Sequence, residues 1–158
     1  MRVNSIAEQS TRYCNYSKDK FGNEVTVCIP SWLNLPEMSV IYDDGIYVAT
    51  PGISITEFEN EEENVFLWET AYAEKQYFQL LELGWKPQQA REVLPLCTAT
   101  EIIHTAFVSD WKHFFDLRYF GTTGAPHPNM VELTGLMAKE ADKYGIWKEL
   151  CNQNVEKA

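Results

Sequence analysis

Residues 60–84 read NEEENVFLWETAYAEKQYFQLLELG and form the longest periodic segment of the chain. Three successive glutamates, residues 61–63, stand where carboxylates favour the positive end of a helix dipole. Apolar side chains then recur at helical spacing, and Gly84 is the kind of residue that follows a last helical turn. This stretch predicts one long helix from about Asn60 to Leu83, whose apolar stripe is formed by Phe66, Ala73, Tyr77, Leu80 and Leu81.

Short segments typical of β-strands lie on both sides of this helix in the sequence. Residues 24–29 alternate apolar with polar side chains and are followed by Pro30, which predicts a half-buried strand. Residues 43–45 read Asp-Asp-Gly between two runs of β-formers, which predicts a hairpin of 40–42 with 46–48. Residues 98–107 are mixed and β-branched, and we expect a further strand there.

Three more helices are predicted after the long one. Pro87 opens a short helix that Pro95 closes, and Ser109 is a candidate N-cap for a helix over 109–120. A last helix runs from Pro128 to Gly145, and its predicted core stripe is Met130, Leu133, Met137, Ala141 and Tyr144. The whole pattern predicts an α+β fold, with a mixed sheet or hairpins packed against the long helix and further C-terminal helices.

Composition indicates one soluble domain over residues 1–158. The chain is 45% hydrophobic and 13% aromatic, which can fill a sizeable core, and its formal net charge of -10 argues against a nucleic-acid partner. There is no apolar run of 18 residues, so we expect no membrane span. Four widely spaced cysteines without a Cys-x-x-Cys pair suggest neither a zinc site nor a redox motif, and we expect free thiols, no metal and a cytoplasmic location.

The chain holds only four arginines against nine lysines. A guanidinium offers a planar fork of donors that suits phosphate oxygens and the carbonyl edge of a base. We therefore hypothesise an anion site assembled from arginines that are far apart in the sequence. The alternative is that the arginines are scattered surface charge.

Three blocks of sequence then resemble one family. Residues 2–13, RVNSIAEQSTRY, keep the spacing of most of the motif Arg-His-Arg-x-x-Ser-x-Asn-Glu-x-Ser-x-Arg-Tyr of the flavin-dependent thymidylate synthases. The second block is LLELG at 80–84 with AREVLP at 90–95, and the third is DWKHFFDLR at 110–118 with APHP at 125–128. The resemblance covers nearly the whole chain, and the blocks contain every arginine.

The resemblance implies a reductive methylation of deoxyuridine monophosphate (dUMP) to thymidylate (dTMP). Methylenetetrahydrofolate would supply the one-carbon unit, and FAD reduced by NADPH would supply the hydride. The cofactors carry the difficult chemistry in such an enzyme, so the protein chiefly positions its ligands and stabilises charge. The family also implies a homotetramer whose active sites are shared between subunits.

The resemblance also implies the dUMP site. Ser10 and Arg12 would hold the phosphate from the motif, Arg91 would reach it from the short helix, and Glu8 and Gln9 would shape the backbone. Arg118 is the expected catalytic residue, because the matching family arginine contacts the uracil carbonyls and stabilises negative charge on the ring.

Four further residues are expected to bind FAD by the same resemblance: Arg2, Ser5, His113 and His127. Ser5 matches the motif serine, and we assign it a hydrogen-bonding and not a covalent role. For the two histidines a structural interpretation stays open, since His113 stands beside Phe114 and His127 stands between two prolines, where it could begin a helix.

The chain departs from the motif at two places. Ala7 replaces the usual Asn, and Met1 stands where the motif has its His, so we expect a chain that lacks the N-terminal segment of the family. An alternative function is therefore a non-catalytic nucleotide-binding relic or assembly partner that has lost FAD binding. A third possibility is an acidic protein-interaction domain.

Overall fold

The computed structural model of the protein describes residues 5–18, 22–35, 39–43, 46–50 and 61–151. Two compact units divide the chain: one comprises residues 8–101, and the other comprises residues 1–7 with 102–158. Each unit is described by itself below. The single domain expected over residues 1–158 stays a prediction.

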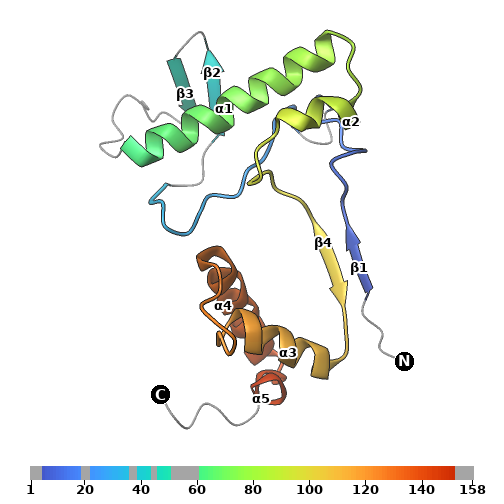
Figure 1. Ribbon diagram of the computed structural model, residues 1–158, viewed down its shortest axis with the longest axis vertical. Helices are drawn as coiled ribbons and strands as arrows, with labels where there is room; N and C mark the ends of the chain where they lie inside the picture. Colours follow the sequence, from blue (N-terminus) through green and yellow to red (C-terminus); the bar gives the residue numbers. More distant parts are fainter. Residues whose placement is uncertain (1–4, 19–21, 36–38, 44–45, 51–60, 152–158) are drawn as a thin grey trace. The chain divides into compact units, whose positions relative to one another are not determined.

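Helices and strands follow one another in mixed order, which confirms the α+β fold class (Figure 1). The elements are β1 (Ser5–Glu8), β2 (Ser39–Asp43), β3 (Ile46–Thr50), α1 (Glu61–Glu82), α2 (Pro87–Ala90), η3 (Arg91–Val93), β4 (Ile102–Thr105), α3 (Val108–Arg118), α4 (Pro128–Lys143) and α5 (Trp147–Leu150). None of the helices within the described ranges is both long and apolar enough to cross a membrane.

The unit of residues 8–101 is organised around α1. The helix ends within one residue of its predicted end, and Gly84 follows it with a φ of 89°. Strands β2 and β3 pair antiparallel with Asp43 opposite Ile46, so the predicted hairpin pairing is confirmed. β2 packs against α1, and α2 lies beside the C-terminal end of the helix (Figure 1).

The core of this unit joins the N-terminal loop to the helices. Its buried residues are Cys14, Tyr16, Tyr77 and Ala90. Tyr77 is fully buried, as its place in the predicted stripe requires. The loop after β1 therefore packs against both α1 and α2.

The predicted strand over residues 24–29 is wrong as a regular strand. Its side chains do alternate between half-buried and exposed, but only an isolated antiparallel bridge forms, between Val27 and Thr98. On the partner segment, residues 95–98 form a turn in which the N–H of Thr98 donates to the carbonyl of Pro95 (3.0 Å). A segment that turns there cannot continue a ladder beyond Cys97, and Pro30 has no N–H to donate.

The other unit contains β4 and three helices. β4 is shorter than the strand predicted over 98–107 and pairs with β1. Helices α3, α4 and α5 surround a core formed by Phe115, Ala138, Ala141 and Leu150. The ring of His104 packs on Trp111 with 4.4 Å between centroids, in line with a structural role for this histidine.

Two sequence expectations in this unit are wrong. Helix α3 starts at Val108 with Phe107 as its N-cap, so Ser109 is not the capping residue. In the core stripe of α4, Leu133 and Tyr144 are exposed, whereas Thr134 is fully buried. Thr134 can face the core because its hydroxyl donates to the carbonyl of Met130 within the same helix (2.7 Å).

A pH-dependent stability is expected from Glu74, on α1. Its carboxylate accepts the backbone N–H of Val25 (2.6 Å), and burial raises its pKa above the usual value, with Glu24 adding to the effect. A carboxyl group with a raised folded-state pKa stabilises the fold below its unfolded pKa and loses that contribution as pH rises through the folded pKa. Ionisation of Glu74 therefore lowers the free energy of unfolding at neutral pH.

Glu74→Gln keeps an acceptor for Val25 and removes the buried charge. We expect a higher Tm than wild type at pH 7 and a difference that shrinks towards pH 4, as measured by thermal unfolding across this range. Glu69→Gln, at an exposed position of the same helix, is the control. A lower Tm of Glu74→Gln than of wild type at pH 7 would show that the hydrogen bond to the charged oxygen outweighs the burial.

Candidate functional site

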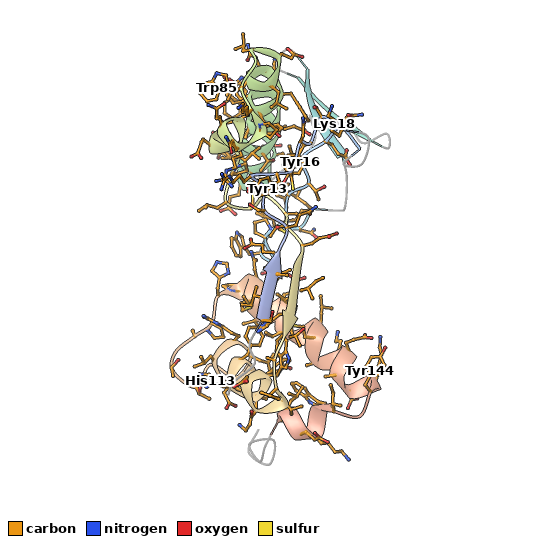
Figure 2. All side chains as sticks on the ribbon, turned by 90° about the vertical axis from the view of Figure 1, so that its right-hand side faces the viewer. Tyr13, Tyr16, Lys18, Trp85, His113 and Tyr144 are labelled. Carbon is orange, nitrogen blue, oxygen red and sulfur yellow. The ribbon has the colours of Figure 1, made fainter. Side chains whose placement is uncertain are left out.

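The loop after β1 carries most of the predicted motif residues and turns at Ser10. The Ser10 carbonyl accepts the N–H of Tyr13 (3.0 Å) and the thiol of Cys14 (3.3 Å), and its hydroxyl accepts the N–H of Arg12 (3.3 Å). Arg12 and Tyr13 are exposed at the turn, whereas Cys14 is buried; Tyr13 is labelled in Figure 2. The Arg12 guanidinium lies over the Tyr13 ring at 5.4 Å.

Tyr77 anchors this loop to the long helix. Its hydroxyl donates to the carbonyl of Cys14 (3.3 Å) and accepts the backbone N–H of Tyr16 (3.5 Å). The rings of Tyr16 and Tyr77 pack edge to face at 5.6 Å. Burial raises the pKa of the Tyr77 phenol, which keeps its proton available for donation.

Two hydrogen bonds bring the motif loop and the α2–η3 segment together. Arg91 donates from a terminal guanidinium nitrogen to the hydroxyl of Thr11 (3.1 Å). Arg12 donates from Nε to the amide oxygen of Gln88 (3.3 Å). The structure thus brings together Arg12 and Arg91, the two arginines predicted to share a phosphate.

Both arginines keep most of their positive charge available. Thr11 and Gln88 are neutral partners, and in the part of the chain that the structure describes Arg12 makes no ion pair. Arg91 lies 3.9 Å from the carboxylate of Glu92, whose side chain is 74% exposed, so solvent screens this pair strongly. The two guanidiniums therefore provide donors and charge for an anion such as a phosphate.

The backbone before the turn is fixed by the segment that precedes β4. Gln9 donates its N–H to the carbonyl of Glu101 (2.8 Å), and its own carbonyl accepts the hydroxyl of Thr100 (2.6 Å). Glu8 is exposed at the end of β1, and the Ser10 side chain is also exposed. The predicted ligand contacts of Glu8, Gln9 and Ser10 stay predictions.

Arg118, the expected catalytic residue, is the last residue of α3 and belongs to the other unit. It is exposed, while Phe115 one turn earlier is buried and Trp111 is half-buried. The carbonyl of Arg118 accepts the hydroxyl of Thr134 (3.3 Å), so α4 holds the last turn of α3. Arg118 thus carries an exposed guanidinium at the end of a helix, and its catalytic role stays a prediction.

Three of the residues expected to bind FAD lie on or beside different elements of this unit. Ser5 begins β1 and is exposed, and His113 is exposed on α3 (Figure 2). His127 is the N-cap of α4, where its Nδ1 accepts the N–H of Asn129 (3.3 Å), so its interpretation as a helix-start residue is confirmed. Arg2 lies outside the described residues. A flavin role for any of them stays a prediction.

Three residues of this arrangement were missed as site residues in the sequence. Gln88 precedes Arg91 by three positions, a spacing that places both side chains on one helical face and could have indicated it. Thr11 stands between the two motif residues Ser10 and Arg12. Tyr77 was predicted only as part of an apolar stripe, and nothing in the sequence reveals the partner of its hydroxyl.

Comparison with known families agrees with the three sequence blocks. A family model described as thymidylate synthase complementing protein matches residues 1–144. The chain therefore belongs to the thymidylate synthase complementing protein family, and the predicted resemblance is confirmed. No curated protein and no solved structure matches the chain. Family membership is consistent with a role of the chain in dTMP synthesis.

The anchoring role of Tyr77 gives a stability prediction. Tyr77→Phe keeps the ring but leaves the Cys14 carbonyl and the Tyr16 N–H without their partner, which costs roughly 1–3 kcal/mol in the free energy of unfolding. Urea unfolding measures this loss. Tyr13→Phe, on the same loop but 78% exposed, should leave stability nearly unchanged. Equal stability of Tyr77→Phe and wild type would show that the hydroxyl does not hold the loop.

Proposed function

We propose that the protein is a flavin-dependent thymidylate synthase that methylates dUMP reductively to dTMP. Methylenetetrahydrofolate is the proposed one-carbon donor, and FAD reduced by NADPH is the proposed hydride source. Membership of the family supports this function. The observation that carries it is the pair of hydrogen bonds from Arg12 to Gln88 and from Arg91 to Thr11, which link the motif loop to the α2–η3 segment and leave both guanidiniums with further donors for the dUMP phosphate.

Phosphate recognition is the proposed task of the motif turn. A guanidinium that donates one N–H to Thr11 or Gln88 retains further donors in a fixed plane. The exposed Ser10 hydroxyl would add a hydrogen bond next to Arg12, and Glu8 and Gln9 would set the backbone of the turn. These contacts together would fix the position of the nucleotide.

Arg118 is the proposed residue for the uracil ring. Its guanidinium would stabilise negative charge on the ring as the ring carbon becomes nucleophilic, which is electrostatic preorganisation. This role rests on the resemblance of residues 110–118 to the family block. The exposure of Arg118 at a helix end is compatible with it.

The chemistry of the flavin residues fits a polar cofactor. Ser5 and His113 present an exposed hydroxyl and an exposed imidazole, which are groups that bind the phosphates or the polar ring edge of FAD. We assign Arg2 and His127 to the same cofactor from the sequence motif. FAD, when bound, supplies the hydride, and these residues would hold and orient it.

We also propose a cytoplasmic homo-oligomer, a tetramer as the family resemblance implies. One face of α1 carries the apolar side chains of Val65, Trp68 and Tyr72 at exposed positions, and the last two rings stack at 5.2 Å. Such a face is commonly covered by another chain. The four free thiols suit a reducing compartment.

A second candidate is a nucleotide-binding relic or assembly partner without flavin. One observation favours it, since the residues of the anion site lie within the unit of residues 8–101 without the predicted flavin residues. Visible absorbance of the purified protein separates the two. Flavin bands with dTMP formation support the enzyme, and a colourless protein that still binds dUMP supports the relic.

Arg91→Ala should weaken dUMP binding about tenfold or more, because a charge-assisted hydrogen bond contributes roughly 1.5–3 kcal/mol. Arg91→Lys should restore the affinity only in part, since the planar fork is lost. Calorimetric titration with dUMP measures both. Lys86→Ala removes one exposed positive charge just before α2 and is the control. Unchanged affinity in Arg91→Ala would rule out the phosphate role.

Arg118→Ala should abolish dTMP formation while the protein stays folded, because the side chain is exposed and only the backbone carbonyl of this residue is bonded to α4. A change within about 0.5 kcal/mol in the free energy of unfolding is expected for such a position. Lys139→Ala, exposed on α4, serves as the control for lost charge. Full activity, or a large loss of stability, would identify Arg118 as a structural residue.

A further inference from the structure

Cys28 and Cys97 face each other across two neighbouring chain segments. The N–H of Cys28 donates to the carbonyl of Cys97 (2.8 Å), next to the antiparallel bridge between Val27 and Thr98. A second bond on the far side of the bridge, from the N–H of Ala99 to the carbonyl of Thr26 (2.9 Å), fixes the same register. Cys97 stands in the turn that the N–H of Thr98 closes on the carbonyl of Pro95 (3.0 Å), so the two cysteines are backbone neighbours beside the bridge.

The geometry of such neighbours suits a disulfide. A backbone hydrogen bond of this kind between neighbouring segments keeps the two Cα atoms about 5–6 Å apart. Disulfides span about 4.4–6.8 Å between Cα atoms, so the two residues are within range of the bond. Burial raises the pKa of the Cys97 thiol, and the nearby Cys28 thiol adds to this effect, which agrees with their proximity.

The two thiols differ in exposure, and this decides which of them reacts first with a reagent in solution. Cys28 is exposed, whereas Cys97 is partly covered. The remaining cysteines, Cys14 and Cys151, are both buried, and the Cys14 thiol donates to a backbone carbonyl inside the motif loop. Cys28 is thus the thiol that a reagent in solution reaches first.

We propose that Cys28 and Cys97 form a reversible disulfide by exchange with a small-molecule disulfide such as oxidised glutathione. The Cys28 thiolate attacks one sulfur of that molecule, forms a mixed disulfide and releases one small thiolate. The Cys97 thiolate then attacks the Cys28 sulfur and releases the second small thiolate. The two protein thiols are oxidised, the small disulfide is reduced to two thiols, and the two protons end on the released thiolates.

The disulfide would act on the segment that holds the motif loop. Cys97 is followed within four residues by Thr100 and Glu101. The hydroxyl of Thr100 donates to the carbonyl of Gln9, and the carbonyl of Glu101 accepts the N–H of Gln9. Oxidation would tie this segment covalently to residues 26–28, in addition to the two hydrogen bonds. The exchange itself does not depend on the proposed methylation chemistry.

The test is incubation of the reduced full-length protein with excess oxidised glutathione under native conditions, followed by alkylation. We expect the intact mass of the protein before alkylation to fall by the mass of two hydrogen atoms. Two thiols should then no longer react with the alkylating reagent. A non-reduced peptide map should show the peptides of Cys28 and Cys97 joined. Cys97→Ser should stop at a glutathione adduct on Cys28, and Cys28→Ser should not react. Cys151→Ala, the control, should form the same disulfide as wild type.

Thermal unfolding gives a second readout on the wild-type chain. A disulfide that encloses a long loop usually stabilises a protein, and we expect oxidation to raise the Tm by about 5 °C or more, with reversal by a reducing thiol. Four unreacted thiols, a stable adduct on Cys28 alone, a bond that uses Cys14 or Cys151, or only disulfide-linked dimers would each overturn the proposal.

Discussion

The buried hydroxyl of Tyr77 determines how the N-terminal loop meets the long helix. A phenol taken out of water without hydrogen-bond partners costs free energy, so the packing of this ring at the core requires a loop conformation that satisfies its hydroxyl. The Cys14 carbonyl and the Tyr16 N–H meet this requirement together. The turn at Ser10 and the position of Arg12 follow from that conformation, because only a few residues separate them from the anchor.

An acidic chain can offer guanidiniums to an anion when their hydrogen-bond partners are neutral. The net charge is -10, yet Arg12 and Arg91 hydrogen-bond to an amide and a hydroxyl. A carboxylate at either place would fix the guanidinium equally well and neutralise it. Gln88 and Thr11 orient the two guanidiniums without neutralising them, and Glu92, 3.9 Å from Arg91, is largely exposed and screened by solvent.

The sequence predicts best the elements whose signals are local. The glutamates of residues 61–63 and Gly84 delimit α1 correctly, and Pro87 and Pro128 begin α2 and α4 as expected. The strand predicted over residues 24–29 does not form because a ladder needs two segments, and the turn over residues 95–98 of the partner segment cannot be seen from residues 24–29 alone. The prediction that Leu133 faces the core is also wrong. Thr134 occupies the core position instead, because its hydroxyl donates to a carbonyl of its own helix.

The residues of the candidate site also differ in whether the sequence predicts them. Arg12 and Arg91 follow from the motif blocks, whereas Gln88 and Tyr77 act through contacts with residues more than 60 positions away, which no local pattern encodes. The cysteines show the same limit.

By spacing alone, Cys28 and Cys97 suggest no partnership, and only the bridge of Val27 with Thr98 brings their backbones together. The turn over residues 95–98 places Cys97 beside Cys28 and, in the same step, prevents residues 95–97 from continuing as a strand. One turn on the partner segment therefore explains both why the bridge ends on this side and why two distant thiols are neighbours.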